Sequence, residues 1–410
     1  SPFFVYLSKV AKVPTDDPQF RFLEDRTKVS MTDRGFLLAG SHSIPAAGST
    51  LTYSVDTSDG ASVDWLVKGM VFAVDYTENN SPETIIVRVE TSPVDAGSTS
   101  TFTGRTISAI DGAETGADNA KCQVIGTSYG EGTGAPDVFS QELDNDFGFT
   151  QIFKTACEMS NTARATRYRG YEDEFQRVWN LKLREHKVDI ERAMLFGQRA
   201  SQNGIQYTEG IAGHVIKNGT AVVDDSALSY SSGAPYFRSS AVSELTYDRI
   251  LSDFEVIYDP ARGGGDSKLA LASLPVISFF NKLGADAFMN RSLVDGTSTA
   301  VNDVSNLRYN MMEKEGSYGH KIMAIDTIHG TMNLVKEPLF RGFASGFCMM
   351  VDLDHVAYRP LVGNGVNRDT QIQTNVQSAD EDLRKDMIMT EAGLEVSLPE
   401  THYLLNLEGV

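Results

Sequence analysis

The sequence predicts an α+β fold assembled from several unlike segments. Period-two alternation dominates residues 48–130, where helical spacing is nearly absent. One long amphipathic helix is predicted over 172–199, and strand patterns dominate again from 321 to the end of the chain. At 410 residues the chain is long enough for two or three compact regions that share a scaffold.

The composition is that of a folded, acidic protein. Hydrophobic residues make up 41% and charged residues 22%, while the formal net charge is −19 and the sequence pI is about 4.8. Such a surface repels phosphate backbones and anionic lipids, so we expect neither tight nucleic-acid binding nor membrane association. No apolar run reaches the roughly 20 residues of a membrane span, and the start of the chain lacks a signal-peptide pattern. We therefore expect a soluble protein made inside a cell.

The first segments predict an arm and then a strand. Residues 2–13 hold a short aromatic-rich run that ends at Pro14, which indicates a short helix or arm docked elsewhere. In the following extended stretch, over 18–38, Phe20 and Phe22 alternate with polar residues before the charged run Glu24-Asp25-Arg26. This pattern is typical of a strand that leads out of a core.

The β-rich block predicts a small barrel or sandwich of its own. Stretches such as 50–55 and 84–89 alternate with period two. Turn clusters at Asp59-Gly60, 79–82 and Asp111-Gly112 separate the strands. A glycine-rich hinge over 130–134 closes the block.

The second half of the chain mixes helices and strands. After an extended stretch over 147–168, the long helix carries apolar residues on approximately one face and would run roughly 40 Å at 1.5 Å per residue. These residues are Trp179, Leu183, Ile190 and Met194. Shorter helices are predicted over 245–258, stopped by Pro260, and over 275–283. The main closing strands are predicted over 347–358 and 394–407.

Two motifs carry weak signals for enzymatic chemistry. Ser128 occupies the centre of a GxSxG pattern after a strand, but the helix that a nucleophile elbow needs does not follow it. Gly263-Gly264-Gly265 lacks the Lys-Ser/Thr that completes a phosphate loop. His186 on the long helix has no acid or nucleophile at a telling spacing. The sequence therefore predicts no catalytic residue and no cofactor.

Metal and thiol chemistry are equally poorly supported. Asp352 and Asp354, followed by His355, are predicted on one side of a strand, where they could bind a divalent cation. No third ligand converges on them, and carboxylates on an exposed strand face are common in so acidic a protein, so we assign no metal site. Cys122, Cys157 and Cys348 are widely spaced, which favours reduced, buried thiols over a disulfide or a zinc site.

Distinctive stretches follow one another over 18–25, 149–153, 160–163, 168–175 and 189–193, densest over 149–197. These stretches and the order of the segments resemble the Hong-Kong-97-type major capsid fold of tailed bacteriophages, in the subgroup with a β-rich domain inserted in the E-loop region. Residues 201–317 match only in outline. The first residues resemble a point inside the family's arm, which implies a preceding segment that was removed or left out. No motif supports an autocatalytic crosslink or a self-cleaving protease.

The resemblance implies a division of the chain into the family's regions. These are an N-terminal arm (1–16), the outgoing E-loop strand (17–47), the inserted β-rich domain (48–135), the return strand (136–171), the P-domain with its spine helix (172–240), the A-domain with adjoining P-domain strands (241–380) and closing P-domain strands (381–410).

The resemblance also implies a structural role without catalysis. The chain would assemble into hexamers and pentamers of an icosahedral shell around packaged double-stranded DNA, without sequence-specific contacts to the DNA. Portal and scaffolding proteins, and a decoration protein as a further candidate, would be its partners. Assembly would take place in the host cytoplasm, and the mature location would be the virion.

An extended hairpin buries little in its own subunit, so its apolar residues gain most by covering a neighbour. On this reasoning we predict that the intersubunit contacts are made by Phe20, Phe22, Glu24, Asp25, Arg26, Ile152 and Phe153.

Two other functions stay open. An encapsulin-like nanocompartment shell shares the fold but encloses protein cargo, and fold alone does not fix function. An adhesin or carbohydrate-binding protein built around the β-rich block is the second alternative, although the long helix and the missing secretion signal count against it.

Overall fold

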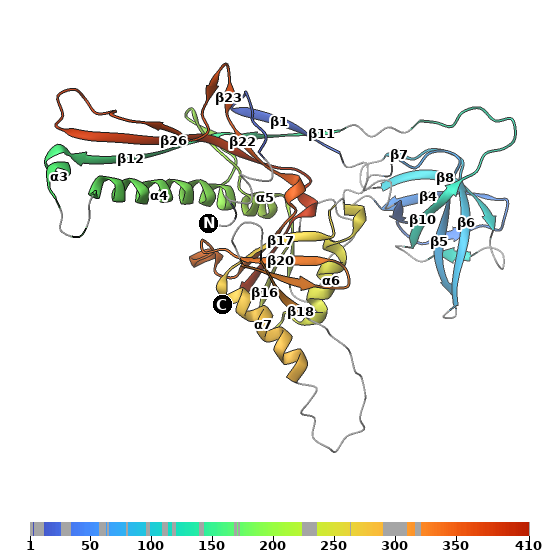
Figure 1. Ribbon diagram of the computed structural model, residues 1–410. Coiled ribbons are helices and arrows are strands. Elements are labelled where there is room, and N and C mark those ends of the chain that lie inside the picture. The colour runs from blue at the N-terminus through green and yellow to red at the C-terminus, as the bar shows by residue number, and fades with distance from the viewer. Residues whose placement is uncertain are drawn as a thin grey trace. The chain divides into compact units, whose positions relative to one another are not determined.

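The computed structural model of the chain divides into two compact units (Figure 1). Unit 1 comprises residues 1–24, 144–228 and 234–410, and unit 2 comprises 25–143 and 229–233. The structure describes residues 3, 12–25, 34–56, 63, 65–78, 81–95, 99–108, 114–116, 120–138, 143–167, 170, 173–223, 236–262, 264–289, 310–315 and 321–409.

A long helix packed along a long strand ladder dominates the first layer of unit 1 (Figure 1). Helix α4 (Glu174–Phe196) begins at Asp173, whose side chain accepts the backbone N–H of Gln176. Strand β12 (Gln151–Ser160) pairs antiparallel with β26 (Leu383–Val396) over its whole length. Strands β22 (Val356–Pro360) and β25 (Gln371–Gln373) pair with the other edge of β26.

An eight-stranded mixed sheet forms the second layer of unit 1. Helices α5 (Ile211–Asn218), α6 (Tyr247–Ile257) and α7 (Leu274–Met289) belong to this region. In spatial order the strands are β15 (Thr220–Val223), β16 (Tyr236–Ala241), β27 (Tyr403–Glu408), β21 (Phe347–Val351), β17 (Ser267–Ala272), β20 (Thr331–Lys336), β19 (Lys321–Asp326) and β18 (Asn310–Glu315). β21 reads as an unbroken apolar run because all five of its residues are buried.

A buried ion pair fastens helix α6 to this sheet. The guanidinium of Arg238 on β16 donates two hydrogen bonds of 2.6 Å to the carboxylate of Asp253 on α6. The hydroxyl of Tyr403 on β27 donates a third, of 2.7 Å, to the same carboxylate. All three side chains are buried among apolar neighbours. Two parallel hydrogen bonds from the guanidinium, together with the third from the tyrosine, offset the free-energy cost of removing both charges from water.

Unit 2 is a β-barrel with its own core. Its strands follow the order β2 (Gly35–Leu37), β10 (Lys121–Thr127), β5 (Met70–Glu78), β6 (Ser81–Val89), β8 (Thr99–Ser108) and β4 (Thr50–Asp56). A bridge between Leu38 and Val55 joins the two ends of this order and closes the barrel. The rings of Phe36, Phe72, Phe102 and Tyr53 fill the interior with edge-to-face and stacked contacts.

The remaining elements are short. In unit 2 they are β3 (His42–Ile44), β7 (Val94–Asp95) and β9 (Glu114–Gly116). In unit 1 they are β1 (Gln19–Glu24), β11 (Asp144–Phe149), α3 (Asn161–Ala165), β13 (Ala200–Gln202), β14 (Ile205–Tyr207), β23 (Val362–Gly363), β24 (Val366–Asn367), and the 3-10 turns η1 (Pro260–Arg262), η2 (Gly342–Ala344), η3 (Leu353–His355) and η4 (Pro399–Thr401).

The α+β class is confirmed, and a long helix after a long strand agrees with the Hong-Kong-97-type layout. The helices predicted over 172–199, 245–258 and 275–283 correspond to α4, α6 and α7, of which α7 ends six residues later than predicted. The predicted family boundaries, including the placing of the barrel as an insert in the E-loop, stay predictions. Most of the arm over 2–13 and the predicted turns Asp59-Gly60, Asn79-Asn80 and Asp111-Gly112 lie outside the described residues.

Three predicted strands are not continuous in the structure. The stretch 347–358 is interrupted by η3, which separates β21 from β22, and 394–407 is interrupted by η4. The extended stretch over 147–168 ends at Ser160, whose hydroxyl accepts the N–H of Ala163 and starts α3. In each case a turn or a short helix lies inside an otherwise extended run, and periodicity alone does not reveal it.

We predict that stability depends on pH through a buried carboxylate, Glu337. Burial, and then the nearby Glu191 of α4, raise its pKa to about 7. Because the folded state then binds a proton more tightly than the unfolded state, stability is highest below the unfolded pKa near 4.5 and falls as pH rises toward 7, by about 3 kcal/mol at most. Urea denaturation between pH 5 and pH 8 measures this slope.

Glu337→Gln should flatten the slope and be more stable than the unmodified chain at pH 8. Glu185→Gln, at an exposed position of α4, should leave the slope as it is. Parallel pH profiles for the Glu337→Gln variant and the unmodified chain would show that Glu337 does not titrate in this range.

Candidate functional site

Five of the seven predicted contact residues lie on β1 or directly after it. Strand β1 pairs antiparallel with β11, from Gln19 opposite Phe149 to Glu24 opposite Asp144. We call this pair the β1–β11 ribbon. Its exposure alternates along β1, so that Phe20, Phe22 and Glu24 point inward.

The prediction that the phenylalanines are left uncovered by their own subunit is wrong. Phe20, Phe22 and Phe153 are 3%, 8% and 7% exposed, respectively. The ring of Phe20 fits against Gly148 and Gly393, where an added Cβ would lie 2.4 and 2.7 Å from the ring. Sequence periodicity could not show this, because the space is provided by two glycines far away in the chain.

The other two phenylalanines also belong to the subunit's own interior. Phe22 lines a small cavity together with Gly148, Leu394 and Val396. Phe153 points from β12 into the main core of the unit, which also contains Met194 of α4. Covering a neighbour is therefore not what keeps these rings out of water.

Of the predicted charged residues, Glu24 has a local role. It is buried, and its Oε1 accepts the backbone N–H of Leu398 at 3.1 Å. Leu398 has a φ of 45°, in the left-handed region that a branched side chain rarely adopts, so this contact supports a strained turn. Asp25 is exposed, and Arg26 lies outside the described residues. The contact roles of Asp25 and Arg26 stay predictions.

Ile152 is the predicted apolar contact residue that is available to a partner. It is 49% exposed and lies on the face of β12 opposite Phe153. Further exposed apolar residues were missed, among them Leu23, 64% exposed on the outer face of β1, and Leu181, 54% exposed on α4. The signal was present, since Leu23 is out of phase with Phe20 and Phe22, and Leu181 lies off the apolar stripe of the helix.

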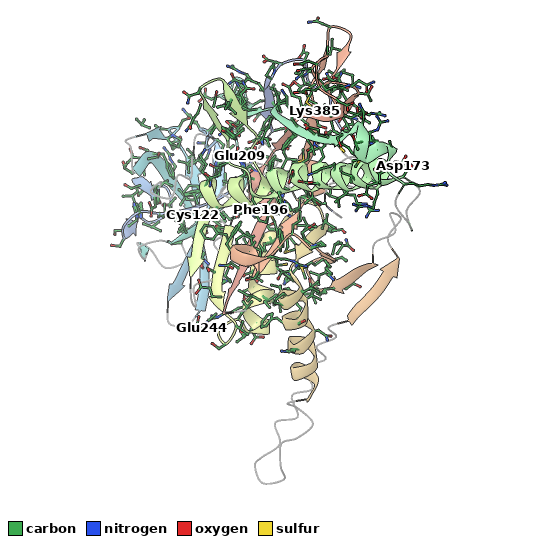
Figure 2. All side chains as sticks on the ribbon, turned by 90° about the vertical axis from the view of Figure 1, so that its left-hand side faces the viewer. Cys122, Asp173, Phe196, Glu209, Glu244 and Lys385 are labelled. Atoms are coloured by element: carbon green, nitrogen blue, oxygen red, sulfur yellow. The ribbon has the colours of Figure 1, made fainter. Side chains whose placement is uncertain are left out.

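The distal half of the helix layer, residues 174–185 of α4 with the facing part of β12, is only partly covered. Buried side chains on α4 begin at His186, whereas Phe175, Trp179 and Leu183 are half-buried. Figure 2 views the layer from this end and labels Asp173, where α4 begins, and Lys385 on β26. Half-covered aromatic and aliphatic side chains at helical spacing are typical of a surface that a partner completes.

The motifs considered for catalysis have structural roles. Ser128 is exposed after β10, its N–H bonds to the Gly69 carbonyl at 2.8 Å, and no helix follows in the described stretch up to Val138. His186 is buried between the hydroxyls of Thr155 and Thr390, at 2.9 and 2.8 Å, and burial lowers its pKa. The histidine thus joins α4 to β12 and β26.

The possible cation site is also explained by local backbone contacts. Asp352 and Asp354 do not lie on one strand face, because Asp352 precedes the 3-10 turn η3 and caps it through the N–H of Asp354 at 3.2 Å. Its other oxygen accepts the N–H of Gly265 at 3.0 Å. Within the described ranges no three His, Cys, Asp or Glu side chains gather as metal ligands. In the same part of the chain no helix is long and apolar enough to cross a membrane.

Comparison with known proteins gives one family for nearly the whole chain. The family model of the SU10 major capsid protein matches residues 1–408. The major capsid protein of Pseudomonas phage PaMx41 is 25% identical over 321 residues, which is 76% of this chain. The match spans 65% of that relative, less than two thirds of its own length.

Solved structures resemble the chain only distantly. A capsid chain of a native GTA particle is 10% identical, with a TM-score of 0.40 over 98% of this chain and 90% of that one. A chain of Microbacterium phage Oxtober96 is 7% identical, with a TM-score of 0.42 over the same two shares.

We predict that Gly393→Ala destabilises unit 1 by about 1–3 kcal/mol. The new Cβ would lie 2.6 Å from the Phe149 carbonyl oxygen and 2.7 Å from the Phe20 ring, so backbone as well as side chain must move. Gly126→Ala is the matched control, because nothing lies within 4 Å of its Cβ position. Thermal denaturation compares the two, and equal midpoints would contradict the packing assigned to Phe20.

Proposed function

The chain belongs to the family of SU10 major capsid proteins, and we propose on this basis that it is the repeating subunit of a bacteriophage shell. Its copies assemble into hexamers and pentamers that close around packaged double-stranded DNA. The observation that carries the proposal is the family match over residues 1–408, since every described element of both units lies inside it.

The distribution of apolar surface supports a role in assembly. The distal half of α4 leaves aromatic and aliphatic side chains half-buried, and Leu23, Ile152 and Leu181 are exposed on three different elements. Covering such a surface with a second copy removes apolar area from water and so lowers the free energy. Repetition of one such contact around a symmetry axis closes a ring of subunits.

Charge supports a non-specific relation to the packaged DNA. The chain carries a net charge of −19, and residues 25–143 alone hold 16 acidic and 7 basic residues. An acidic subunit encloses DNA without binding it tightly, because phosphates are repelled from most of its surface. We therefore propose contact with DNA on the inner face of the shell without sequence recognition.

We extend the proposal to the partners of the chain, its location and its division into regions. Portal and scaffolding proteins, and in some shells a decoration protein, complete the particle, which is assembled in the host cytoplasm and leaves as a virion. We assign no enzymatic step to the chain. The β1–β11 ribbon and unit 2 correspond in this proposal to the E-loop region with its inserted domain, and α4 corresponds to the spine helix of the P-domain.

Negative-stain electron microscopy of the purified chain, produced together with its genomic neighbours, tests the proposal. Closed shells, or rings of five or six subunits, are the expected result. Shells that enclose a co-purifying protein cargo in place of DNA would favour the nanocompartment. A monomer that stays dispersed under all co-expression conditions, and binds glycans, would point to the adhesin.

We predict that Leu181→Glu reduces the yield of assembled particles at least about tenfold, because a charge then faces the partner surface. Helix α4 should persist, since position 181 is exposed in the subunit itself. Ser201→Glu adds the same charge at an exposed position of β13, outside the distal half of α4, so it serves as the control. Sizing chromatography gives the assembled fraction and circular dichroism checks the fold. Equal yields for both variants would exclude Leu181 from the interface.

A further inference from the structure

A single arginine, Arg199, contacts β11 of the β1–β11 ribbon in three ways. Arg199 lies three residues beyond Phe196, the last residue of α4, and its Nη1 donates to Oδ1 of Asp146 at 2.8 Å and to the carbonyl oxygen of Phe147, both on β11. Its guanidinium also lies over the Phe147 ring, 4.4 Å from the centroid. Three kinds of contact, an ion pair, a backbone hydrogen bond and a stacked ring, thus converge from one side chain onto two consecutive residues.

The other side of the guanidinium rests on a rigid platform, residues 208–210. Nε of Arg199 lies 3.5 Å from Oε2 of Glu209. Glu209 is held in place by its neighbours, because the Thr208 N–H bonds to the side chain of Gln151 and the Gly210 N–H bonds to the Gly197 carbonyl at 3.0 Å. His214 of α5 lies 3.3 Å from the same Glu209 oxygen.

Close backbone packing keeps this platform against the end of α4. A Cβ at Gly213 would lie 2.3 Å from the Gly197 carbonyl oxygen, and a Cβ at Gly210 would lie 2.6 Å from the Gly197 nitrogen. Figure 2 labels Glu209 and Phe196, which mark the platform and the last residue of α4. The glycines allow the end of α4 and the platform to touch. This contact fixes the position of Arg199 independently of its contacts with the ribbon.

The ribbon is the point from which the chain leaves unit 1. The chain passes into unit 2 after Glu24 and returns from it before Asp144, and these two residues face each other as the last pair of the ribbon. Phe20 fixes the opposite end of β1 against Gly393, and Glu24 bonds to Leu398. Arg199 is the contact that comes from the helix layer and acts on β11.

We propose that Arg199 is a positioning residue that sets the direction of the β1–β11 ribbon for assembly. The inference rests on the proposed function, because it assigns Arg199 the task of presenting one region of the subunit to a second copy at a reproducible angle. The residue type fits the task. Only a planar guanidinium can pair with a carboxylate, bond to a carbonyl and stack on a ring at the same time, and a lysine ammonium cannot.

The test compares Arg199→Lys with Arg192→Lys. Arg192 is an exposed residue of α4 whose ion pair with Asp189, at 3.2 Å, has no contact with the ribbon. Hydrogen exchange of the full-length unassembled chain measures the ribbon directly. In Arg199→Lys, exchange of amides over 19–24 and 144–149 should speed up by about tenfold while α4 keeps its protection. Arg192→Lys should match the unmodified chain throughout.

Assembly is the second readout. Arg199→Lys shells should be fewer or irregular in size, with melting within a few degrees of the unmodified chain. Unchanged ribbon exchange together with regular shells would overturn the inference. If Arg199→Lys does not fold, Phe147→Leu replaces it with the same expectations, because it removes the ring under the guanidinium, together with that ring's contact to Phe149, and keeps the ion pair to Asp146. An unmodified chain that never assembles would contradict the proposed function, whereas the exchange comparison would still decide the role of Arg199.

Discussion

Unit 1 is organised by the packing of one helix, α4, against one strand pair, β12 and β26. Helix α4 runs along the ladder of β12 and β26, and its inward residues from His186 onward are buried against those strands. The same ladder holds β22 and β25 on its far edge, and Gly393 on β26 receives the ring of Phe20. A two-layer element of this kind buries only one face of each layer, so the other faces are left for solvent or for partners.

The long elements could be predicted from the sequence because their periodicity extends over many residues. Helix α4 differs from its predicted range by two or three residues at each end, and its N-terminal boundary is explained by the Asp173 cap. Shorter features were missed for a physical reason. The turns η3 and η4 depend on contacts such as Asp352 with Gly265 and Glu24 with Leu398, which join residues 87 and 374 positions apart.

For the candidate contact residues, too, local periodicity was predictive and long-range contacts were not. The alternation on β1 correctly separates Phe20 and Phe22 from their polar neighbours. It does not show whether the apolar face of β1 is covered by the subunit itself or by a second copy. That answer depended on Gly148 and Gly393, which are silent in any hydrophobic pattern. Apolar periodicity does not indicate the exposed leucines, because a residue that contacts a partner lies off the apolar stripe that packs into the subunit's own core. Arg199 was missed because its partners lie about 50 residues away.

We propose that the distal half of α4 and the outer face of β12 become an interface when copies assemble. Hydrogen exchange of the unassembled subunit, compared with the assembled particle, measures this. Amides over 174–185 and 151–160 should gain protection in the particle, while the barrel core around Phe72 and Phe102, already buried in the subunit, should stay unchanged. Protection gained only elsewhere, with these two segments exchanging as in the free subunit, would contradict it.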